Sequence, residues 1–403
     1  MSLTTKQIIE TTERFAVRNY ERYPVVLASG HGAWIIDIDG KDYLDMAAGY
    51  GANNWGHNHP RITRVAQEQA GKLNVVSGNY YNEDHAKLLE VLCGLCGKDK
   101  VLFSCEGVVS VEAAIKISRK WGYLKKGIEE NSAEILSTDK NFHGRSLGAI
   151  AMSPVEQYRF GFGPLPPGFY KQVVFGNPDS LEQAITKNTV AFFVEIIAGE
   201  GGIHVSPDVY FKEVEKICRK NNVLLVVDEI QTGLGRTGYD FAYQHEGIEP
   251  DIIIIGKSLG GGIVPLSVVL TDDCIMRVIS PGDHGSTFGG YPFGCAIGLE
   301  SLAVLKEEKL SQRSREMGDY LMDGLRSIKS RYIKEIRGRG LFIGMEFSGI
   351  NNHRVCEELL KENLLCVTAR DNVVRFTPPL VISRVDIEWA VKRIEKILCR
   401  KKL

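Results

Sequence analysis

Four consecutive isoleucines, Ile252–Ile255, constrain the fold of this chain more than any other feature. A β-branched run with no polar position is typical of a strand that is buried on both faces. Helical patterns separate this run from similar ones at 101–104, 134–138, 190–196 and 223–229. The alternation predicts an α/β fold whose mostly parallel central sheet is flanked by helices, with the ligand at the carboxyl ends of the strands.

The two ends of the chain follow a different pattern. Residues 1–50 contain an amphipathic segment and a hairpin signal at Asp39-Gly40. After residue 300, two helical patterns precede a strand-rich segment and a last helix. We therefore expect a large domain over 51–299 and a smaller α+β domain that combines 1–50 with 300–403.

Composition excludes several classes of function. The 49 Lys and Arg residues balance 50 Asp and Glu residues and are interspersed with them, so no basic stripe predicts nucleic-acid binding. No apolar run approaches the length that a membrane span needs. The first residues lack the apolar block of a signal peptide, and the nine cysteines are scattered, which suits a reducing compartment. We expect a cytoplasmic protein.

One pair of cysteines, Cys93 and Cys96, has the spacing of a metal or redox site. The chain has no second pair of this kind, and the pair lies in an apolar segment with helical periodicity. We interpret the segment as a core helix and predict no metal site.

Two polar residues come directly after buried runs, Lys257 after the isoleucines and Asp228 after 223–227. A lysine with a lowered pKa at this position can form a Schiff base with a carbonyl cofactor, and Gly260–Gly262 would let the backbone approach a bulky ligand. A buried carboxylate such as Asp228 could pair with the pyridinium nitrogen of pyridoxal phosphate. Alone, each residue also suits a structural role: a lysine that reaches solvent, or an aspartate in a helix cap or ion pair.

A glycine pattern at Gly233–Gly238 matches the dinucleotide-binding motif GxGxxG. Five residues separate it from the preceding strand, and no long amphipathic helix follows it. Both features are needed for that site, so we predict no dinucleotide there.

Eight ordered segments make nearly the whole chain resemble the class III, fold type I, pyridoxal-phosphate aminotransferases, and among them most closely the ornithine aminotransferases. The segments are Asn19-Tyr20, ASGHGAWIIDIDGKDYLD, GHNHP, FHGRSLGAI, VVDEIQTGLGRTG, DIIIIGKSLGGG, PGDHGSTFGG and VVRFTPPLVI. The resemblance implies pyridoxal 5′-phosphate bound by the large domain, and a homodimer whose active sites are shared across the interface.

By resemblance, Lys257 is the lysine that carries the cofactor and moves the reacting proton. Asp228 is the partner of the pyridinium nitrogen, and Gln231 donates to the ring hydroxyl oxygen. Phe142 and Ile230 cover the two faces of the ring.

The phosphate would meet three further residues. The backbone N–H groups of Gly107 and Val108 begin a helix there, a favourable place for an anion. Thr287 would reach the phosphate from the other subunit.

Substrate carboxylates would be held by Arg145 and Arg375, whose planar guanidinium groups suit that task. Glu200 resembles a switch that pairs with Arg375 while a diamine occupies the site and releases it for a dicarboxylate. Tyr20 and Tyr50 stand where ornithine aminotransferases have tyrosines, although both would also suit a core.

The implied reaction moves the δ-amino group of ornithine to 2-oxoglutarate, giving glutamate 5-semialdehyde and glutamate. Acetylornithine or 4-aminobutyrate as amino donor is the alternative within the family. A weakly catalytic or non-catalytic protein is the alternative of another class, because Glu106 replaces a hydroxyl residue of the family's phosphate loop. Further departures are Ile196 and Ala198, in place of a proline and a glutamine, and Tyr291, in place of an asparagine.

Overall fold

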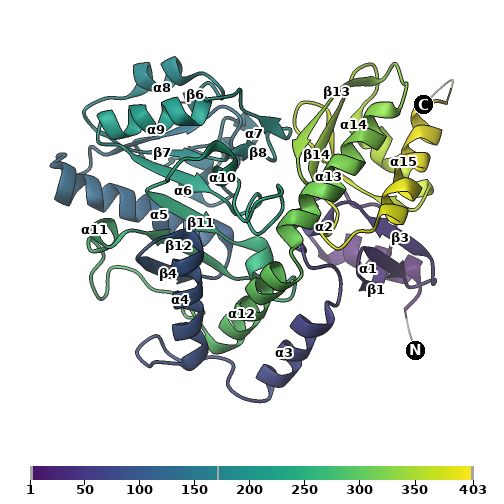
Figure 1. Ribbon diagram of the computed structural model, residues 1–403, viewed down its shortest axis with the longest axis horizontal. Helices are drawn as coiled ribbons and strands as arrows, with labels where there is room; N and C mark the ends of the chain where they lie inside the picture. The colour runs from purple at the N-terminus through teal and green to yellow at the C-terminus, as the bar shows by residue number, and fades with distance from the viewer. Residues whose placement is uncertain (1–2, 170–171, 401–403) are drawn as a thin grey trace.

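A computed structural model describes residues 3–169 and 172–400. A seven-stranded sheet forms the middle of its left-hand part in Figure 1. In spatial order the strands are β4 (Lys100–Ser104), β12 (Ser267–Thr271), β11 (Ile252–Ile255), β10 (Leu224–Asp228), β7 (Thr189–Val194), β5 (Glu134–Thr138) and β6 (Gln172–Val173). All pairs are parallel except those of β12, which runs antiparallel to both β11 and β4. The prediction of a mostly parallel sheet is confirmed.

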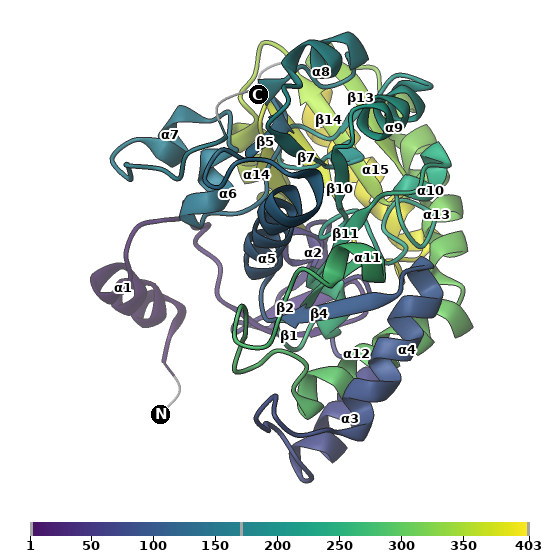
Figure 2. The same ribbon diagram turned by 90° about the vertical axis from the view of Figure 1, so that its left-hand side faces the viewer.

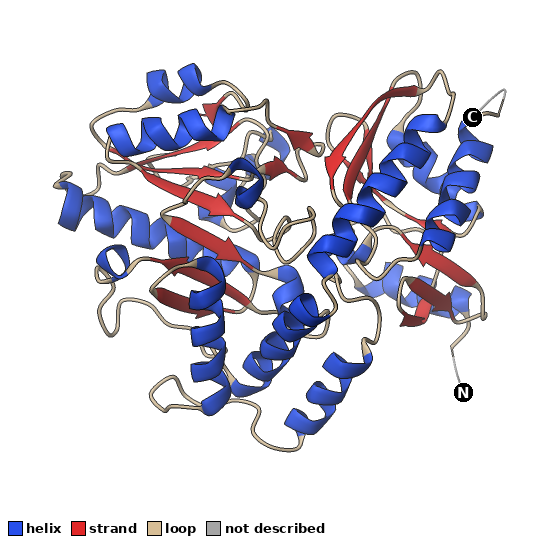
Figure 3. Ribbon diagram, in the orientation of Figure 1, coloured by secondary structure: helices blue, strands red, loops and turns tan. Residues whose placement is uncertain are grey.

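The isoleucine run is buried because helices cover both faces of this sheet, as Figure 3 shows. Ile252 and Ile254 pack in the apolar cluster that contains the inner face of α5 (Gly107–Trp121). Ile253 and Ile255 pack in the opposite cluster with α9 (Tyr210–Lys220). Neither face meets water, which explains the absence of a polar position in the run.

Smaller elements complete the large domain. They are α6 (Leu147–Ala151), α7 (Glu156–Arg159), α8 (Pro178–Ala184), α10 (Tyr243–Glu246), α11 (Asp273–Met276), the π-helix η1 (Gly122–Lys126), the 3₁₀ helix η2 (Lys257–Gly260) and the two-stranded pair β8 (Ile197–Ala198) and β9 (His204–Val205).

Three helices pack together below the central sheet in Figure 1: α3 (Pro60–Ala70), α4 (Glu83–Cys96) and α12 (Pro292–Glu307). Both cysteines of the CxxC pair lie on α4, as predicted, and burial raises the pKa of the Cys96 thiol. Within 3–169 and 172–400, acidic, histidine and cysteine side chains form no group of three that could hold a metal ion.

The chain ends meet in a second region, on the right of Figure 1. An antiparallel sheet has the order β13 (Ile333–Arg339), β14 (Phe342–Phe347), β17 (Val373–Phe376), β16 (Val367–Ala369). Beside it lie α13 (Leu310–Ser327), α14 (Asn352–Lys361) and α15 (Arg384–Leu398).

A small sheet joins the N-terminal segment to this region. It has the order β1 (Leu27–His31), β2 (Trp34–Asp37), β3 (Asp42–Asp45), β15 (Leu364–Leu365). The expected hairpin at Asp39-Gly40 connects β2 to β3, and β15 pairs in parallel with β3. These pairings support the proposed small domain of 1–50 and 300–403; residue 299, where its predicted boundary falls, lies within α12.

The first helix, α1 (Thr5–Phe15), stands apart from the body in Figure 2 and contains no buried residue. A short helical segment, α2 (Ala48–Gly51), leads from the small sheet toward the large domain. In the part of the chain that the structure describes, no helix is long and apolar enough to cross a membrane.

Candidate active site

Several predicted site residues lie at the same edge of the central sheet because their strands run in parallel. Asp228 ends β10, Lys257 follows β11 and Phe142 follows β5. Gly107 begins the helix after β4. The fold therefore brings residues from four separate segments of the chain to one edge.

Lys257 begins η2 with a φ of 45°, in the left-handed region that side chains other than glycine seldom adopt. The next residue, Ser258, is held by the segment that follows α2: its Oγ donates to Gly51 O at 3.1 Å, and its carbonyl accepts the Trp55 indole N–H at 2.7 Å. Burial lowers the pKa of Lys257 to about 8, although the carboxylates of Asp228 and Glu195 oppose the shift. The sequence hypothesis required such a lysine.

The glycines after Lys257 approach protein atoms rather than an open space. A Cβ on Gly261 would lie 2.7 Å from Cγ2 of both Ile62 and Ile297, and one on Gly262 would lie 2.8 Å from the Asn53 Oδ1. Both glycines have positive φ. These two glycines therefore allow close packing of η2 on its own chain. Their expected service to the close approach of a ligand stays a prediction.

Asp228 is buried and uses both carboxylate oxygens. Its Oδ2 lies 2.7 Å from His143 Nδ1, and its Oδ1 accepts the Ile230 N–H at 3.0 Å. Burial disfavours a charged His143, but the hydrogen bond and charge of Asp228 prevail and raise the pKa of that imidazole. His143 was missed as a site residue, although it lies in the quoted segment FHGRSLGAI.

The start of α5 lies against Ile230. A Cβ on Gly107 would be 2.8 Å from Ile230 Cδ1, so only glycine allows this approach. Glu106 precedes the helix as its N-cap, but its exposed side chain makes no capping hydrogen bond. The backbone N–H groups of Gly107 and Val108 have no hydrogen-bond partner among the described residues.

Three predicted substrate residues meet beside Gln231. Glu200 Oε2 lies 2.9 Å from Arg375 Nη1, and Arg375 is buried with its Cζ 5.4 Å from the centroid of the Tyr50 ring. Gln231 Nε2 donates to the Tyr50 carbonyl at 2.8 Å. The predicted pairing of the switch carboxylate with its arginine is therefore present.

Arg145, Tyr20 and Thr287 are exposed in the single chain. The Cζ of Arg145 lies 3.5 Å from the centroid of the Tyr158 ring. Tyr20 lies near enough to Tyr50 to affect the pKa of its phenol. The neighbour of Thr287, Ser286, contacts Cys105, which lies just before α5, at 3.4 Å, from Oγ to Sγ.

Comparison with known proteins decides the family. The pattern described as aminotransferase class-III matches residues 15–398. The chain is a class-III aminotransferase.

Ornithine aminotransferases are among the curated relatives of this aminotransferase. The protein of Geobacillus sp. (strain WCH70) is 45% identical over 397 residues, which are 98% of this chain and 99% of the relative. The protein of Bacillus subtilis (strain 168) is 45% identical over 394 residues, 98% of each chain.

Two solved structures extend the comparison. The ornithine aminotransferase from Toxoplasma gondii ME49 has a TM-score of 0.95 and 39% identity, over 98% of this chain and 95% of that chain. The acetylornithine aminotransferase from Elizabethkingia anophelis has a TM-score of 0.89 and 36% identity, over 98% and 99%. These similarities confirm the predicted fold type I.

Glu195 is a second buried residue of the aminotransferase site that the sequence prediction left out. Its Oε2 accepts the Phe142 N–H at 2.9 Å, and its Oε1 accepts the Gly199 N–H at 3.2 Å. Burial raises its pKa to about 7, and nearby Asp228 adds to the shift while His143 opposes it. The signal in the sequence was its place at the end of the apolar run 190–196. It connects the loop of Phe142 with the loop that ends at Glu200.

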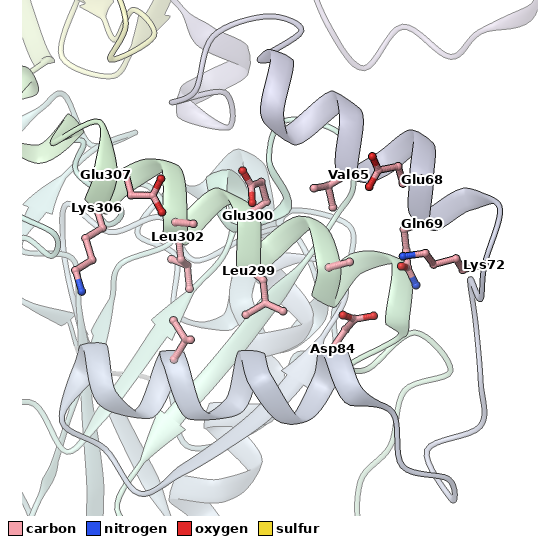
Figure 4. A pocket seen from close by; sticks show the side chains of 13 residues that line it. Val65, Glu68, Gln69, Lys72, Asp84, Leu299, Glu300, Leu302, Lys306 and Glu307 are labelled. Carbon is pink, nitrogen blue, oxygen red and sulfur yellow. The ribbon is translucent and has the colours of Figure 1, made fainter.

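One pocket adjoins this site and another lies away from it. One, of about 680 Å³, adjoins the switch and is lined by Glu200, Arg370 and His353 among others. The other, of about 560 Å³, lies between α3, α4 and α12, where Figure 4 shows apolar side chains such as Leu299 amid a charged rim. None of the residues that line it is a predicted site residue.

Proposed function

We propose that this aminotransferase transfers the δ-amino group of ornithine to 2-oxoglutarate, with pyridoxal 5′-phosphate as its cofactor. The products are glutamate 5-semialdehyde and glutamate. The ion pair of Glu200 with buried Arg375, 2.9 Å apart beside Tyr50, carries this proposal, since it suits a site that accepts two different substrates in turn. Similarity to ornithine aminotransferases along the whole chain supports it.

The residues at the sheet edge fit the cofactor. The N–H groups of Gly107 and Val108, which have no partner in the described part of the chain, suit its phosphate, and buried Asp228 suits a protonated ring nitrogen. Lys257, with its lowered pKa, suits covalent attachment to its aldehyde. When bound, pyridoxal phosphate supplies an electron sink for the electrons released at the amine-bearing carbon.

Asp228 and His143 would act as one unit. The carboxylate accepts from His143 on Oδ2, and this hydrogen bond raises the pKa of the imidazole despite its burial. A negative charge there would hold a proton on the cofactor's ring nitrogen. Glu195 fixes the Phe142 backbone and so orients the ring proposed to cover the cofactor.

Lys257 would move the reacting proton. A pKa of about 8 leaves part of the Nζ population unprotonated near neutral pH. That neutral amine can take a proton from the carbon that bears the reacting nitrogen and return it elsewhere, as a general base and acid must. The helix η2 and its contacts through Ser258 hold the side chain at the sheet edge.

Charge complementarity would select the substrates. Glu200 neutralises Arg375 while a donor with a distal amine is bound, so no carboxylate is needed there. A dicarboxylate offers a second anion, which can replace Glu200 on the guanidinium. Arg145 would hold the carboxylate at the other end of either substrate.

We further propose a cytoplasmic homodimer. The loop of Thr287 is exposed together with Phe288, and the segment of exposed Tyr80 and Tyr81 adds apolar surface. Large exposed aromatic groups of this kind mark protein interfaces. Across such an interface Thr287 would reach the phosphate of the partner.

A substrate panel tests the reaction. Purified protein with added pyridoxal phosphate and 2-oxoglutarate should give the highest kcat/KM with ornithine, and lower values with acetylornithine and 4-aminobutyrate. A preference for acetylornithine or 4-aminobutyrate would overturn the proposed substrate but not the family. Absence of transamination with all three would favour a non-catalytic protein.

A further inference from the structure

The guanidinium of Arg145 lies on an aromatic ring instead of beside a carboxylate. Its Cζ is 3.5 Å from the centroid of Tyr158 and 5.6 Å from that of Phe142. Within the described ranges of the chain, Arg145 makes no ion pair with an acidic side chain. An exposed arginine held only by rings has its hydrogen-bond donors free for a ligand.

The short distance to Tyr158 also fixes the orientation of the group. A planar guanidinium so close to a ring centroid has to lie flat on the ring, because a tilted one would push its nitrogens into the ring carbons. Its N–H bonds then point sideways, parallel to the ring. This leaves the paired donors that bind a carboxylate in a bidentate manner available.

Tyr158 itself is well placed to hold a fixed position. It is half-buried in α7, and its N–H donates to the Val155 carbonyl at 3.1 Å. Its ring meets the Phe142 ring edge to face, with centroids 6.3 Å apart and planes at 84°. Phe142 is in turn fixed by Glu195 through the backbone hydrogen bond at 2.9 Å. The tyrosine therefore connects the carboxylate clamp to the residue proposed to cover the cofactor ring.

We infer that Tyr158 is a positioning residue, which orders Arg145 for the substrate carboxylate by carrying its guanidinium on the ring face. The inference rests on the proposed function, because it needs a carboxylate substrate at Arg145. The ring of Tyr158, and not its hydroxyl, orients the guanidinium. Without the ring, Arg145 would have to lose side-chain freedom on binding, which weakens affinity.

Binding of glutarate, an unreactive five-carbon diacid, to the cofactor-loaded protein tests the inference by calorimetry. In Tyr158→Leu the dissociation constant should rise roughly tenfold, and in Tyr158→Phe it should stay within about twofold of the wild-type value. The visible absorption of the bound cofactor and the melting temperature should change little in either variant. Should Tyr158→Leu fail to fold, Tyr158→Gln removes the ring face in the same way.

Two comparisons separate positioning from a structural role. Tyr239→Leu is the matched control, because the Arg315 Cζ lies 4.4 Å from the Tyr239 ring centroid, and it should leave glutarate binding unchanged. In the donor half-reaction, Tyr158→Leu should raise KM for ornithine but leave KM for 1,4-diaminobutane, which lacks the carboxylate, unaltered. Unchanged glutarate binding in Tyr158→Leu, or equal losses in Tyr158→Phe and Tyr158→Leu, would overturn the inference. A third outcome separates the inference from the proposed function. If Tyr158→Leu weakens glutarate binding, Tyr158→Phe does not, and the wild-type protein does not turn over ornithine, the proposed substrate is overturned and the inference is retained.

Discussion

Glu106 brings a negative charge to the place where the proposed phosphate site lies. It is the N-cap of α5, its side chain is exposed, and it makes no capping hydrogen bond. A phosphate dianion at this helix N-terminus is favoured by free N–H groups and the helix dipole. A carboxylate within a few ångströms opposes it by about 1–4 kcal/mol, depending on screening.

Replacement of this residue should therefore strengthen cofactor binding. We expect Glu106→Thr to bind pyridoxal phosphate more tightly than wild type, because a negative charge is lost and a hydroxyl donor is gained. Glu106→Gln is the control that removes only the charge. Titration of the apo protein at two salt concentrations measures the effect, which should shrink at high salt. Equal affinity in all three proteins would mean that the phosphate lies elsewhere.

Tyr50 lies between the substrate clamp and the cofactor residues. Its ring is near Arg375, and its carbonyl accepts from Gln231. We expect Tyr50→Ile to open the site to 4-aminobutyrate. The ratio of kcat/KM for 4-aminobutyrate to kcat/KM for ornithine should rise by a factor that corresponds to about 1–3 kcal/mol of activation free energy. The ratio of the two specificity constants is the measurement; a ratio equal to that of wild type would assign Tyr50 to packing alone.

Single residues were predictable where local sequence determines their place. Lys257 and Asp228 follow buried runs, so their position at the sheet edge follows from the strand itself. His143 was missed because its significance depends on a contact between distant segments, its 2.7 Å approach to Asp228. Glu195 does end an apolar run, but its role depends on its hydrogen bond with the distant Phe142 N–H. Hydrophobic periodicity carries no signal for such contacts.

At the scale of elements, the strands and helices of the large domain follow from apolar periodicity, but their order in the sheet does not. The antiparallel β12 pairs with β11, which precedes it in the chain, but also with β4, which lies far earlier in the chain. Nor does periodicity identify β15, a two-residue strand whose partner β3 lies more than 300 residues earlier. Pairing between remote segments depends on the packing of the whole fold.

Because η2 packs closely against α12, we expect that Gly261, which follows η2, cannot be replaced without a loss of stability. Gly261→Ala would combine a positive φ of 68° with a Cβ 2.7 Å from Ile62 and Ile297. We expect a loss of about 2–5 kcal/mol in unfolding free energy, from backbone strain and overpacking together.

Gly127→Ala is the control for backbone strain, because Gly127 has a φ of 76° and no atom within 4 Å of the added Cβ. It should cost only about 1–2 kcal/mol. Denaturant unfolding compares the two variants. Equal losses would show that η2 can move away from α12 without cost.

For the whole molecule, the proposed dimer makes each active site a joint product of two chains. Lys257 is at the sheet edge of its own chain, whereas Thr287 is exposed on the surface. If sites are shared, a mixed dimer of Lys257→Ala and Thr287→Asp chains contains one site with both changes and one site with neither.

Unfolding and refolding an equal mixture of these two chains should therefore restore about a quarter of the wild-type sites, by random assortment into symmetric dimers. Each variant refolded alone should show little activity, since one lacks the lysine and the other repels the phosphate. Activity of the mixture no higher than the mean of the separate variants would indicate that Thr287 serves its own chain or no site at all.

The proposed role of Lys257 in ornithine transamination is tested most directly by comparing wild type with Lys257→Ala. Both the absorption of the cofactor and the transamination of ornithine are measured. Wild type with pyridoxal phosphate should show a visible absorption band and form glutamate 5-semialdehyde from ornithine and 2-oxoglutarate. Lys257→Ala should stay folded, lose that band and lose turnover by several powers of ten, because it lacks the group that binds the cofactor covalently and moves the proton. Near-normal turnover in Lys257→Ala would contradict the assignment of Lys257 as the residue that binds the cofactor and moves the proton.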